Sequence, residues 1–230
     1  MEAVILAGGM GTRLKDVIHT MPKPMAPIAG RPFIEYLFRQ LIRWNITDIV
    51  LSVSYMWESI QDYFKDGSRW GIRLRYSVEH EPLGTGGAIR EAADFITGDP
   101  FLVMNGDSYF DLDFQAFQTF HLSRKASLSL ALAALDHTGR YGRVTLDDSG
   151  RILSFEEKTA KGPGLVNSGI YLFSRHVLPC FPPGSVSLEQ AVLPRLVGQG
   201  LYAMPAEAFF VDIGIPEDYF YLNDHHERLS

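Results

Sequence analysis

The first half of the chain alternates short apolar runs with segments of helical periodicity, and no other feature limits the fold as strongly. The run Ala3–Ala7 predicts a buried strand that leads into a glycine-rich loop. Apolar residues then recur at helical spacing from Phe33 to Trp44, behind Pro32, which the first turn of a helix tolerates. This alternation of strand and helix predicts an α/β fold with a doubly wound, mostly parallel, Rossmann-like sheet.

The alternation continues to Asn105 and then changes character. The same patterns predict strands at Asp48–Val53, Arg73–Val78 and Phe101–Asn105, and helices at Trp57–Phe64 and Ala88–Phe95. Strict alternation of polar and apolar residues over Ser127–Leu132 predicts a half-exposed strand. Further strands are expected at Arg143–Leu146, Arg151–Phe155 and Leu165–Phe173, and a helix near Leu188–Val197. The second half therefore predicts a mixed or antiparallel extension of the sheet.

Composition and charge narrow the class of protein. With 230 residues, 46% of them hydrophobic, the chain is expected to fold as one domain, 1–230. The net charge of -6 and the lack of a basic run argue against a nucleic-acid partner. No stretch approaches about 18 consecutive apolar residues and no signal peptide is recognisable, so we expect a cytoplasmic protein without a membrane partner. The single cysteine, Cys180, fits a reducing compartment and is expected to be a buried thiol.

The segment most informative about chemistry is the glycine-rich loop Leu6–Leu14, which is followed by Pro22–Pro24. Closely spaced glycines let backbone N–H groups approach a polyphosphate, and Arg13 and Lys23 supply positive charge. The spacing matches neither the Gly-x-Gly-x-x-Gly dinucleotide pattern nor a Walker A sequence. Taken alone, the glycines are more typical of a simple turn with a solvent-facing arginine.

These residues resemble the signature of the sugar-phosphate nucleotidyltransferase family, which is Gly-Gly-x-Gly-Thr-Arg-Leu with a downstream Pro-Lys-Pro. Five motifs occur in the family's order between Val4 and Tyr219. The resemblance implies that Arg13 meets the leaving pyrophosphate and that Lys23 contacts the phosphate under attack. It also implies that the glycine loop wraps the triphosphate through Leu6, Ala7, Gly8, Gly9, Gly11 and Thr12.

A second glycine-rich segment, Glu81–Gly87, follows the third predicted strand, and open α/β sheets bind ligands at such strand ends. By itself the segment is more typical of a strand-to-helix turn. The resemblance implies that it lies against the nucleobase and nucleoside, which makes Glu81, Gly84 and Thr85 nucleotide-binding candidates. The nucleotide-binding part of the chain would then extend over about residues 1–112.

Asp107 and Asp212 each follow a short apolar run. A carboxylate at a strand end near phosphates suits Mg²⁺, which prefers oxygen ligands, although a lone aspartate is more often a helix cap or turn former. Both aspartates match positions that hold the metal in the family. The resemblance therefore implies that they bind Mg²⁺, and that Arg13, Lys23 and Asp107 are the catalytic residues.

The charged run Glu156–Lys158 is, by itself, typical of a solvated surface. The resemblance implies that Glu157 binds sugar hydroxyls and that Lys158 binds the phosphate of the sugar. It implies further that Gly142, Asn167 and Gly169 belong to the sugar pocket. The sugar-binding part would extend over about residues 113–230.

The predicted reaction is attack by a phosphate oxygen of a sugar 1-phosphate on the α-phosphorus of a nucleoside triphosphate, with departure of pyrophosphate. Positioning and charge neutralisation would dominate catalysis, because both reactants are anionic. The segment Glu81–Thr85 resembles the guanylyl branch, so GTP and D-glycero-α-D-manno-heptose 1-phosphate are the favoured partners. Mannose 1-phosphate, uridylyl transfer to N-acetylmuramic acid 1-phosphate, and a nucleotide-sugar sensor without activity are the alternatives. The oligomeric state stays open.

Overall fold

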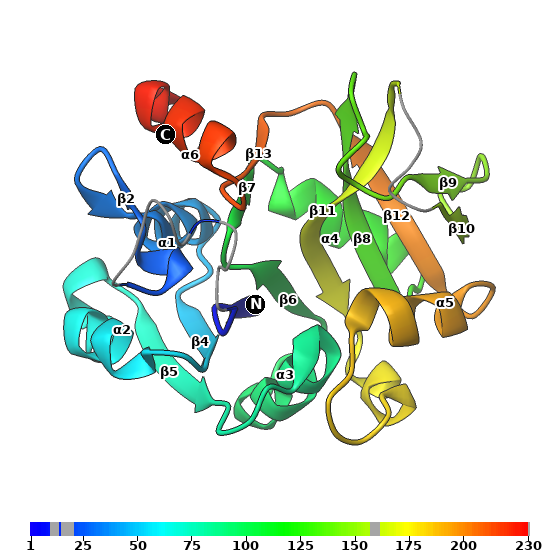
Figure 1. Cartoon of the computed structure of the whole chain (residues 1–230). Helices are drawn as coiled ribbons and strands as arrows, with labels where there is room; N and C mark the ends of the chain where they lie inside the picture. The colour runs from blue at the N-terminus through cyan, green and yellow to red at the C-terminus, as the bar shows by residue number, and fades with distance from the viewer. Residues whose placement is uncertain (10–13, 15–20, 157–161, 230) are drawn as a thin grey trace.

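The computed structural model describes residues 1–9, 14, 21–156 and 162–229, and its centre is a seven-stranded sheet (Figure 1). The strand order is β12-β8-β11-β6-β1-β4-β5. The strands are β1 Glu2–Leu6, β4 Asp48–Val53, β5 Arg73–Val78, β6 Phe101–Asn105, β8 Leu128–Leu135, β11 Gly164–Phe173 and β12 Leu201–Ala206. Within this sheet β11 runs antiparallel to its neighbours β6 and β8, and the other pairings are parallel. The predicted α/β class, with a mostly parallel sheet and a mixed second half, is confirmed.

Helices cover both faces of the sheet, and successive strand residues point to opposite faces. In β1, Ala3 and Ile5 belong to a core shared with α1 (Phe33–Arg43) and α2 (Trp57–Phe64). Val4 lies in a second core with α3 (Gly84–Ala92). Because β1 is buried on both faces, its sequence is a continuous apolar run, as expected of a central parallel strand.

Four predicted elements, β4, β5, β6 and α2, agree with the structure residue for residue. Helix α3 begins at Gly84, earlier than the predicted start at Ala88, because the glycine-rich segment forms its first turn. Glycine is needed there for packing, since Gly84 has φ +66° and an added Cβ would lie 2.7 Å from the Val186 carbonyl oxygen. The helix predicted near Leu188–Val197 is a π-helical turn, η6 (Leu188–Val192), followed by the short helix α5 (Leu193–Leu196).

Strand β8 is more deeply buried than its sequence predicts. The prediction of a half-exposed strand is wrong, because Leu128 to Ala133 are buried on both faces between β11 and β12. Ser129, one of the polar residues behind that prediction, is fully buried, and its hydroxyl is hydrogen-bonded to His121 Nδ1 at 2.8 Å. A small hydroxyl side chain with a buried partner can therefore occupy a core position that its polarity seems to exclude.

The prediction that Cys180 is a buried thiol is also wrong. Cys180 is exposed at the end of a 3-10 turn, η5 (Arg175–Cys180). Within that turn Val177 occupies the core-facing position. The turn offers room in the core for one side chain, and the thiol lies on its outer side.

Several short elements join the sheet to the rest of the molecule. They are the strand pairs β2–β3 (Pro27–Ile28, Arg31–Pro32), β7–β13 (Ser108–Phe110, Phe210–Asp212) and β9–β10 (Val144–Leu146, Ile152–Phe155), helices α4 (Phe114–Ser123) and α6 (Pro216–Asp224), and 3-10 turns η2 (Lys23–Met25), η3 (Ser68–Trp70), η4 (Ala93–Phe95) and η7 (His226–Arg228). Helix α6 returns to the first half of the chain (Figure 1). Its Tyr219 hydroxyl donates to the Pro27 carbonyl oxygen at 2.8 Å, and Asn223 Oδ1 accepts from the Ala29 N–H at 2.9 Å.

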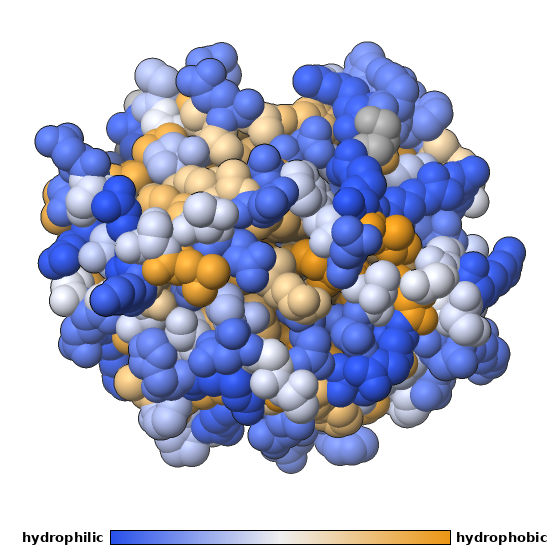
Figure 2. All heavy atoms as spheres, turned by 180° about the vertical axis from the view of Figure 1, so that it is seen from behind, coloured by the Kyte–Doolittle hydropathy of each residue, from blue (hydrophilic) through white to orange (hydrophobic). Residues whose placement is uncertain are grey.

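The outer surface is mixed in polarity. Figure 2 shows hydrophilic residues over most of one face, with hydrophobic residues between them in separate patches. Among the described residues, no helix combines the length and the apolar character needed to cross a membrane.

Candidate functional site

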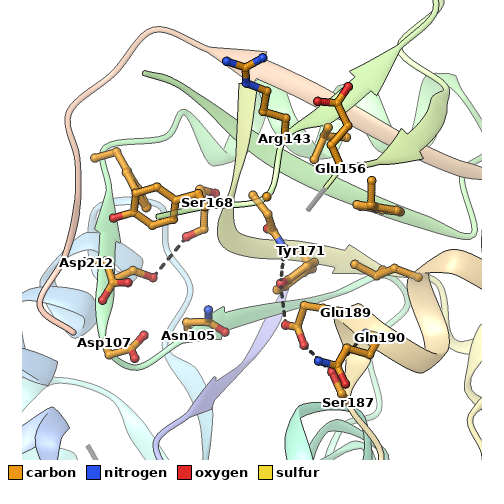
Figure 3. Close-up of a pocket in the computed structure, with 18 residues that line it drawn as sticks. Asn105, Asp107, Arg143, Glu156, Ser168, Tyr171, Ser187, Glu189, Gln190 and Asp212 are labelled. Atoms are coloured by element: carbon orange, nitrogen blue, oxygen red, sulfur yellow. Dashed lines mark hydrogen bonds between the residues drawn. The ribbon is translucent and has the colours of Figure 1, made fainter. Parts of the chain in front are cut away.

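A cleft of about 700 Å³ opens where β6 and β11 meet the loops and strands of the second half (Figure 3). Its walls come from both halves of the chain, as the lining shows: Asn105, Asp107, Ser108, Tyr141, Gly142, Arg143, Val144, Phe155, Glu156, Asn167, Ser168, Tyr171, Ser187, Glu189, Gln190, Leu193, Phe210 and Asp212. The carboxyl ends of β1 and β6 lie side by side in the sheet, so Leu6, where the glycine-rich loop begins, pairs with Asn105 of the cleft. Open α/β sheets bind their ligands at such an edge.

At one end of the cleft two lining carboxylates contact a nearly buried lysine, and we call the three residues the Lys23 cluster (Lys23, Asp107 and Asp212). Lys23 Nζ lies 2.6 Å from Asp107 Oδ2 and 3.7 Å from Asp212 Oδ1. The Lys23 side chain is 8% exposed, whereas the two carboxylates remain partly open to the cleft. A buried ammonium group requires such partners, because an unpaired charge away from water is costly.

Strand pairing brings the two aspartates together although they are far apart in sequence. Strands β7 and β13 pair so that Asp212 lies opposite Ser108, and the Ile213 N–H donates to the Asp107 carbonyl oxygen at 2.9 Å. Asp107 in turn is held beside the first strand, because the Gly106 N–H donates to the Leu6 carbonyl oxygen at 2.8 Å. A side chain at Gly106 would collide with that oxygen, which explains glycine at this position.

The Pro-Lys-Pro segment directs Lys23 into this cluster. Pro22 is extended, and its carbonyl oxygen accepts from the Met25 N–H at 2.8 Å, which closes the η2 turn. The two prolines fix the backbone on either side of Lys23 and leave its side chain pointing toward the carboxylates. Of the predicted catalytic residues, the structure thus brings Lys23 and Asp107 together, while Arg13 lies outside the described residues.

The described part of the glycine loop follows β1. Leu6 and Gly8 are half-buried, Ala7 is buried and Gly9 is exposed. Gly8 packs against Glu79, whose carboxylate oxygen Oε1 would lie 2.8 Å from an added Cβ. The predicted nucleotide-binding residues Gly11 and Thr12 fall, with Arg13, outside the described residues.

In the second predicted nucleotide-binding segment, Glu81–Gly87, some residues are exposed to solvent and others pack against the rest of the protein. Glu81 is exposed and does not line the described cleft. Gly84 packs against Val186. Because Gly84 has no side chain, the backbone of Val186 can approach it closely. The Thr85 hydroxyl donates to Glu189 Oε2 at 2.9 Å and accepts from the Leu188 N–H at 2.8 Å.

Two of the predicted sugar-binding residues, Gly142 and Asn167, line the cleft, and Gly169 lies beside Asn167. Asn167 Oδ1 accepts from the Gly169 N–H at 3.0 Å, and Asn167 Nδ2 donates to the Tyr171 hydroxyl at 2.7 Å. Gly169 has φ +79° and lies against the Asn105 side chain, so only glycine suits this bulge of β11. Gly142 lines the cleft beneath the Glu156 carbonyl oxygen. Glu157 and Lys158 lie outside the described residues.

Several cleft residues were assigned no role from the sequence: Asn105, Tyr141, Arg143, Glu156, Tyr171, Ser187, Glu189 and Gln190. Asn105 lies two residues before Asp107 at the same strand end, which is a signal that could have identified it. Tyr171 lies in an apolar strand and is indistinguishable in sequence from a core residue. Glu189 lies in the π-helical turn η6, which cannot be recognised from the sequence.

Two tyrosines of the cleft stay protonated over the physiological pH range. Burial raises the pKa of Tyr141 to about 12, and the nearby Asp212 carboxylate adds to the rise. Burial raises the pKa of Tyr171 well above its ordinary value, and Glu189 contributes in the same direction. Both phenols can therefore donate hydrogen bonds at neutral pH.

Carboxylates dominate the described lining, with Asp107, Glu156, Glu189 and Asp212 against the cation Arg143. Such a wall repels anions unless a cation is added or neutral groups of the ligand face the carboxylates. The cleft is therefore suited to a ligand with hydroxyl groups at one end and to a cation-assisted anion at the other.

Comparison with known proteins gives a consistent result. Residues 2–228 match the nucleotidyl transferase family. The chain is 41% identical over 222 residues to the D-glycero-α-D-manno-heptose 1-phosphate guanylyltransferase of Campylobacter jejuni. The aligned residues cover 96% of this chain and 98% of that relative. The chain is 36% identical over 224 residues to the mannose-1-phosphate guanylyltransferase of Mycobacterium tuberculosis, covering 95% of this chain but 62% of the relative.

A solved structure with a similar fold extends this comparison. HddC from Yersinia pseudotuberculosis, in a complex with GMP-PN, matches with a TM-score of 0.88 and 37% sequence identity. The match covers 98% of this chain and 99% of HddC.

Proposed function

The chain belongs to the nucleotidyl transferase family and is a sugar 1-phosphate nucleotidyltransferase, and we propose that it transfers GMP from GTP to D-glycero-α-D-manno-heptose 1-phosphate. The observation that carries this proposal is the 41% identity to a heptose guanylyltransferase over nearly the full length of both chains. The likeness to HddC, solved with GMP-PN, supports a guanine nucleotide.

On the nucleotide side, the proposal uses the loop after β1 and the segment before α3. Backbone N–H groups of Gly8 and Gly9 are available at the carboxyl end of β1 for the triphosphate, together with Leu6, Ala7 and the residues Gly11, Thr12 and Arg13. The exposed Glu81 carboxylate would accept from the donor edge of guanine. Gly84 and Thr85 would form the turn beside the nucleoside.

The Lys23 cluster fits Mg²⁺. This ion takes oxygen ligands, and it is commonly bound by one or two carboxylates while substrate phosphates and water fill its other positions. Asp107 and Asp212 would hold it, since their carboxylates share one cation in the structure and are both partly open to the cleft. When bound, it would supply positive charge to the phosphate oxygens.

On the sugar side, Asn167 and the backbone at Gly142 and Gly169 would bind sugar hydroxyls. Glu157 would add a carboxylate for hydroxyls and Lys158 a cation for the phosphate. This division agrees with the charge of the cleft, because the carboxylates near Tyr171 suit neutral hydroxyl donors and not phosphate oxygens.

In the reaction, an oxygen of the sugar 1-phosphate forms a bond to the α-phosphorus of GTP while the bond from that phosphorus to pyrophosphate breaks. Lys23 would neutralise charge on the phosphate under attack, and Arg13 would neutralise charge on the leaving pyrophosphate. No proton has to be removed from the attacking phosphate oxygen when it is ionised. The protein therefore contributes alignment and charge, with no covalent intermediate.

Mannose 1-phosphate is the second candidate substrate, because the chain is also 36% identical to a mannose-1-phosphate guanylyltransferase. A manno-heptose differs from mannose by one further hydroxymethyl group. If the pocket hydrogen-bonds that group, mannose should lose about ten- to a hundredfold in kcat/KM, because a buried polar partner would stay unpaired.

The test is a comparison of kcat/KM for the two sugar 1-phosphates with GTP and Mg²⁺, scored by pyrophosphate release. The proposal expects higher kcat/KM for the heptose. A clear preference for mannose would transfer the chain to the mannose branch and overturn the heptose assignment.

A further inference from the structure

A chain of hydrogen bonds links α3 to β11 along one wall of the cleft, and we call it the Tyr171 network (Thr85, Asn167, Tyr171 and Glu189). Glu189 Oε2 accepts from the Thr85 hydroxyl at 2.9 Å and from the Ser187 hydroxyl at 3.0 Å. Glu189 Oε1 accepts from the Tyr171 hydroxyl at 3.4 Å, and that hydroxyl accepts from Asn167 Nδ2. Figure 3 shows Tyr171, Glu189 and Ser187 in this order along one wall of the cleft.

The one hydrogen of the Thr85 hydroxyl is used within the protein. A threonine hydroxyl has one hydrogen to donate, and Thr85 donates it to Glu189. Thr85 also accepts from the N–H of Leu188, the first residue of η6, which has no partner inside its own helical turn. Two backbone hydrogen bonds reinforce this contact between α3 and η6. The Val186 N–H donates to the Leu83 carbonyl oxygen at 2.7 Å, and the Gly86 N–H donates to the Val186 carbonyl oxygen at 2.8 Å.

The Glu189 carboxylate, by contrast, is held by hydrogen bonds but can accept a further one. The residue is exposed and lines the cleft, and its two oxygens have four acceptor positions, of which three are taken by the hydroxyl groups of Thr85, Tyr171 and Ser187. Within residues 1–9, 14, 21–156 and 162–229, its hydrogen-bond partners are neutral hydroxyl groups, and it forms no salt bridge. A fixed carboxylate with spare acceptor capacity suits a hydroxyl donor and repels a phosphate.

We propose that Thr85 serves the sugar side of the reaction, where its hydroxyl positions the Glu189 carboxylate to accept a hydrogen bond from a hydroxyl of the sugar. The π-helical turn η6 is consistent with this role, because such turns occur frequently at functional sites. The inference rests on the proposed location of the sugar beside Asn167, but not on the choice of base or sugar. It assigns Thr85 a positioning role that differs from its predicted contact with the nucleotide.

The first experiment measures separate KM values for the two substrates with Thr85→Val. Valine keeps the shape of threonine but removes the hydroxyl, so Glu189 loses a donor. We expect the KM for the sugar 1-phosphate to rise about tenfold, as for loss of a hydrogen bond to a charged group, with the KM for GTP changed by less than about twofold. Thr85→Ser keeps the hydroxyl and should restore most of the sugar affinity.

The second experiment tests whether Thr85 acts through Glu189. Glu189→Ala should raise the KM for the sugar at least as much as Thr85→Val does, and adding Thr85→Val to it should raise that KM by less than about twofold more. Glu189 is exposed, so this variant tests the inference even if Thr85→Val fails to fold. Melting temperatures of all variants identify any loss of folded protein.

The wild-type enzyme is assayed first with each nucleotide and sugar, and the variants are assayed with its best pair. Failure of guanylyl transfer would therefore appear in the wild type, before any variant is compared. A rise in the KM for the nucleotide alone, an equal rise in both KM values, or independent effects of Thr85→Val and Glu189→Ala would overturn the inference.

Discussion

The two ends of the cleft are held together by different forces. The Lys23 cluster joins three charged groups over 2.6 and 3.7 Å, with a nearly buried ammonium between partly open carboxylates. The Tyr171 network joins one carboxylate to neutral hydroxyl and amide groups around a fully buried tyrosine. One end therefore offers charge to its ligand, and the other offers fixed positions for hydrogen bonds.

This difference suggests a division of labour between the substrates. Phosphate transfer moves negative charge from one oxygen to another, so the end that carries charge should govern turnover. Recognition of a sugar depends on hydroxyl groups whose geometry must be matched, so the network should govern affinity for the sugar. Variants at the two ends should therefore separate kcat from the KM for the sugar.

The largest effect is expected from neutralising either aspartate of the Lys23 cluster. Asp107→Asn and Asp212→Asn should each lower kcat by about a hundredfold or more, because each removes a charged oxygen ligand proposed for Mg²⁺. Steady-state rates over a range of Mg²⁺ concentrations measure this loss. Asp111→Asn is the matched control, because Asp111 is half-exposed and pairs with Arg43 away from the cleft. Near-native rates for either cluster variant at limiting Mg²⁺ would refute its role as a ligand.

A comparison of Arg13→Ala with Lys158→Ala should give the next largest effects, although both residues lie outside the described part of the chain. Arg13→Ala should lower kcat by about a hundredfold, because its charge is assigned to the leaving pyrophosphate. Lys158→Ala should mainly raise the KM for the sugar 1-phosphate, by about tenfold. If the two variants had equal effects on kcat and on the KM for the sugar 1-phosphate, the two roles would not be separate.

A smaller change is expected from Tyr171→Phe, which removes one hydroxyl from the network. Asn167 Nδ2 would lose its acceptor, and the KM for the sugar should rise about three- to tenfold while kcat changes little. Because burial raises the pKa of Tyr171 well above its ordinary value, the wild-type KM should not change from pH 6 to pH 9 through this group. A drop in kcat as large as that of Asp107→Asn would erase the distinction between the two ends.

The smallest effect on activity, with a clear effect on stability, is expected from His121 on α4. Burial lowers its pKa to about 4, so the folded protein holds it neutral while the unfolded chain binds a proton below about pH 6.5. Stability is thus complete above pH 6.5 and is lost as the pH falls toward 4, by about 1–2 kcal/mol between pH 7 and pH 5. Chemical denaturation of wild type and His121→Gln at both pH values measures this, and equal pH dependence would contradict it.

Local patterns were sufficient to predict much of the first half of the fold. Strands β4 and β6 are mostly apolar runs, β5 alternates polar and apolar residues, and the stretch predicted as α2 coincides with the helix. In the second half, the polar residues of β8 led to the wrong prediction of a half-exposed strand. Ser129 is buried and hydrogen-bonded to His121, and no local pattern reveals that hydrogen bond. Burial of a polar residue depends on a partner elsewhere in the chain.

The candidate site divides in the same way. Asp107 and Asp212 could be chosen because each follows an apolar run and matches a metal-holding position of the family, but only the pairing of β7 with β13 makes them neighbours. Tyr171 and Glu189 gave no signal, since one resembles a core residue and the other a surface charge. Their role depends on contacts among α3, β11 and η6, and such contacts follow from the tertiary structure alone.

The most direct test of this account is pyrophosphate release by the purified wild-type protein with D-glycero-α-D-manno-heptose 1-phosphate, Mg²⁺ and each of GTP, UTP, dTTP, CTP and ATP in turn. We predict that kcat/KM is highest for GTP, by at least about tenfold over the other four nucleotides. Release that is equally efficient with UTP or dTTP, or that occurs without GTP being preferred, would contradict the proposal of guanylyl transfer.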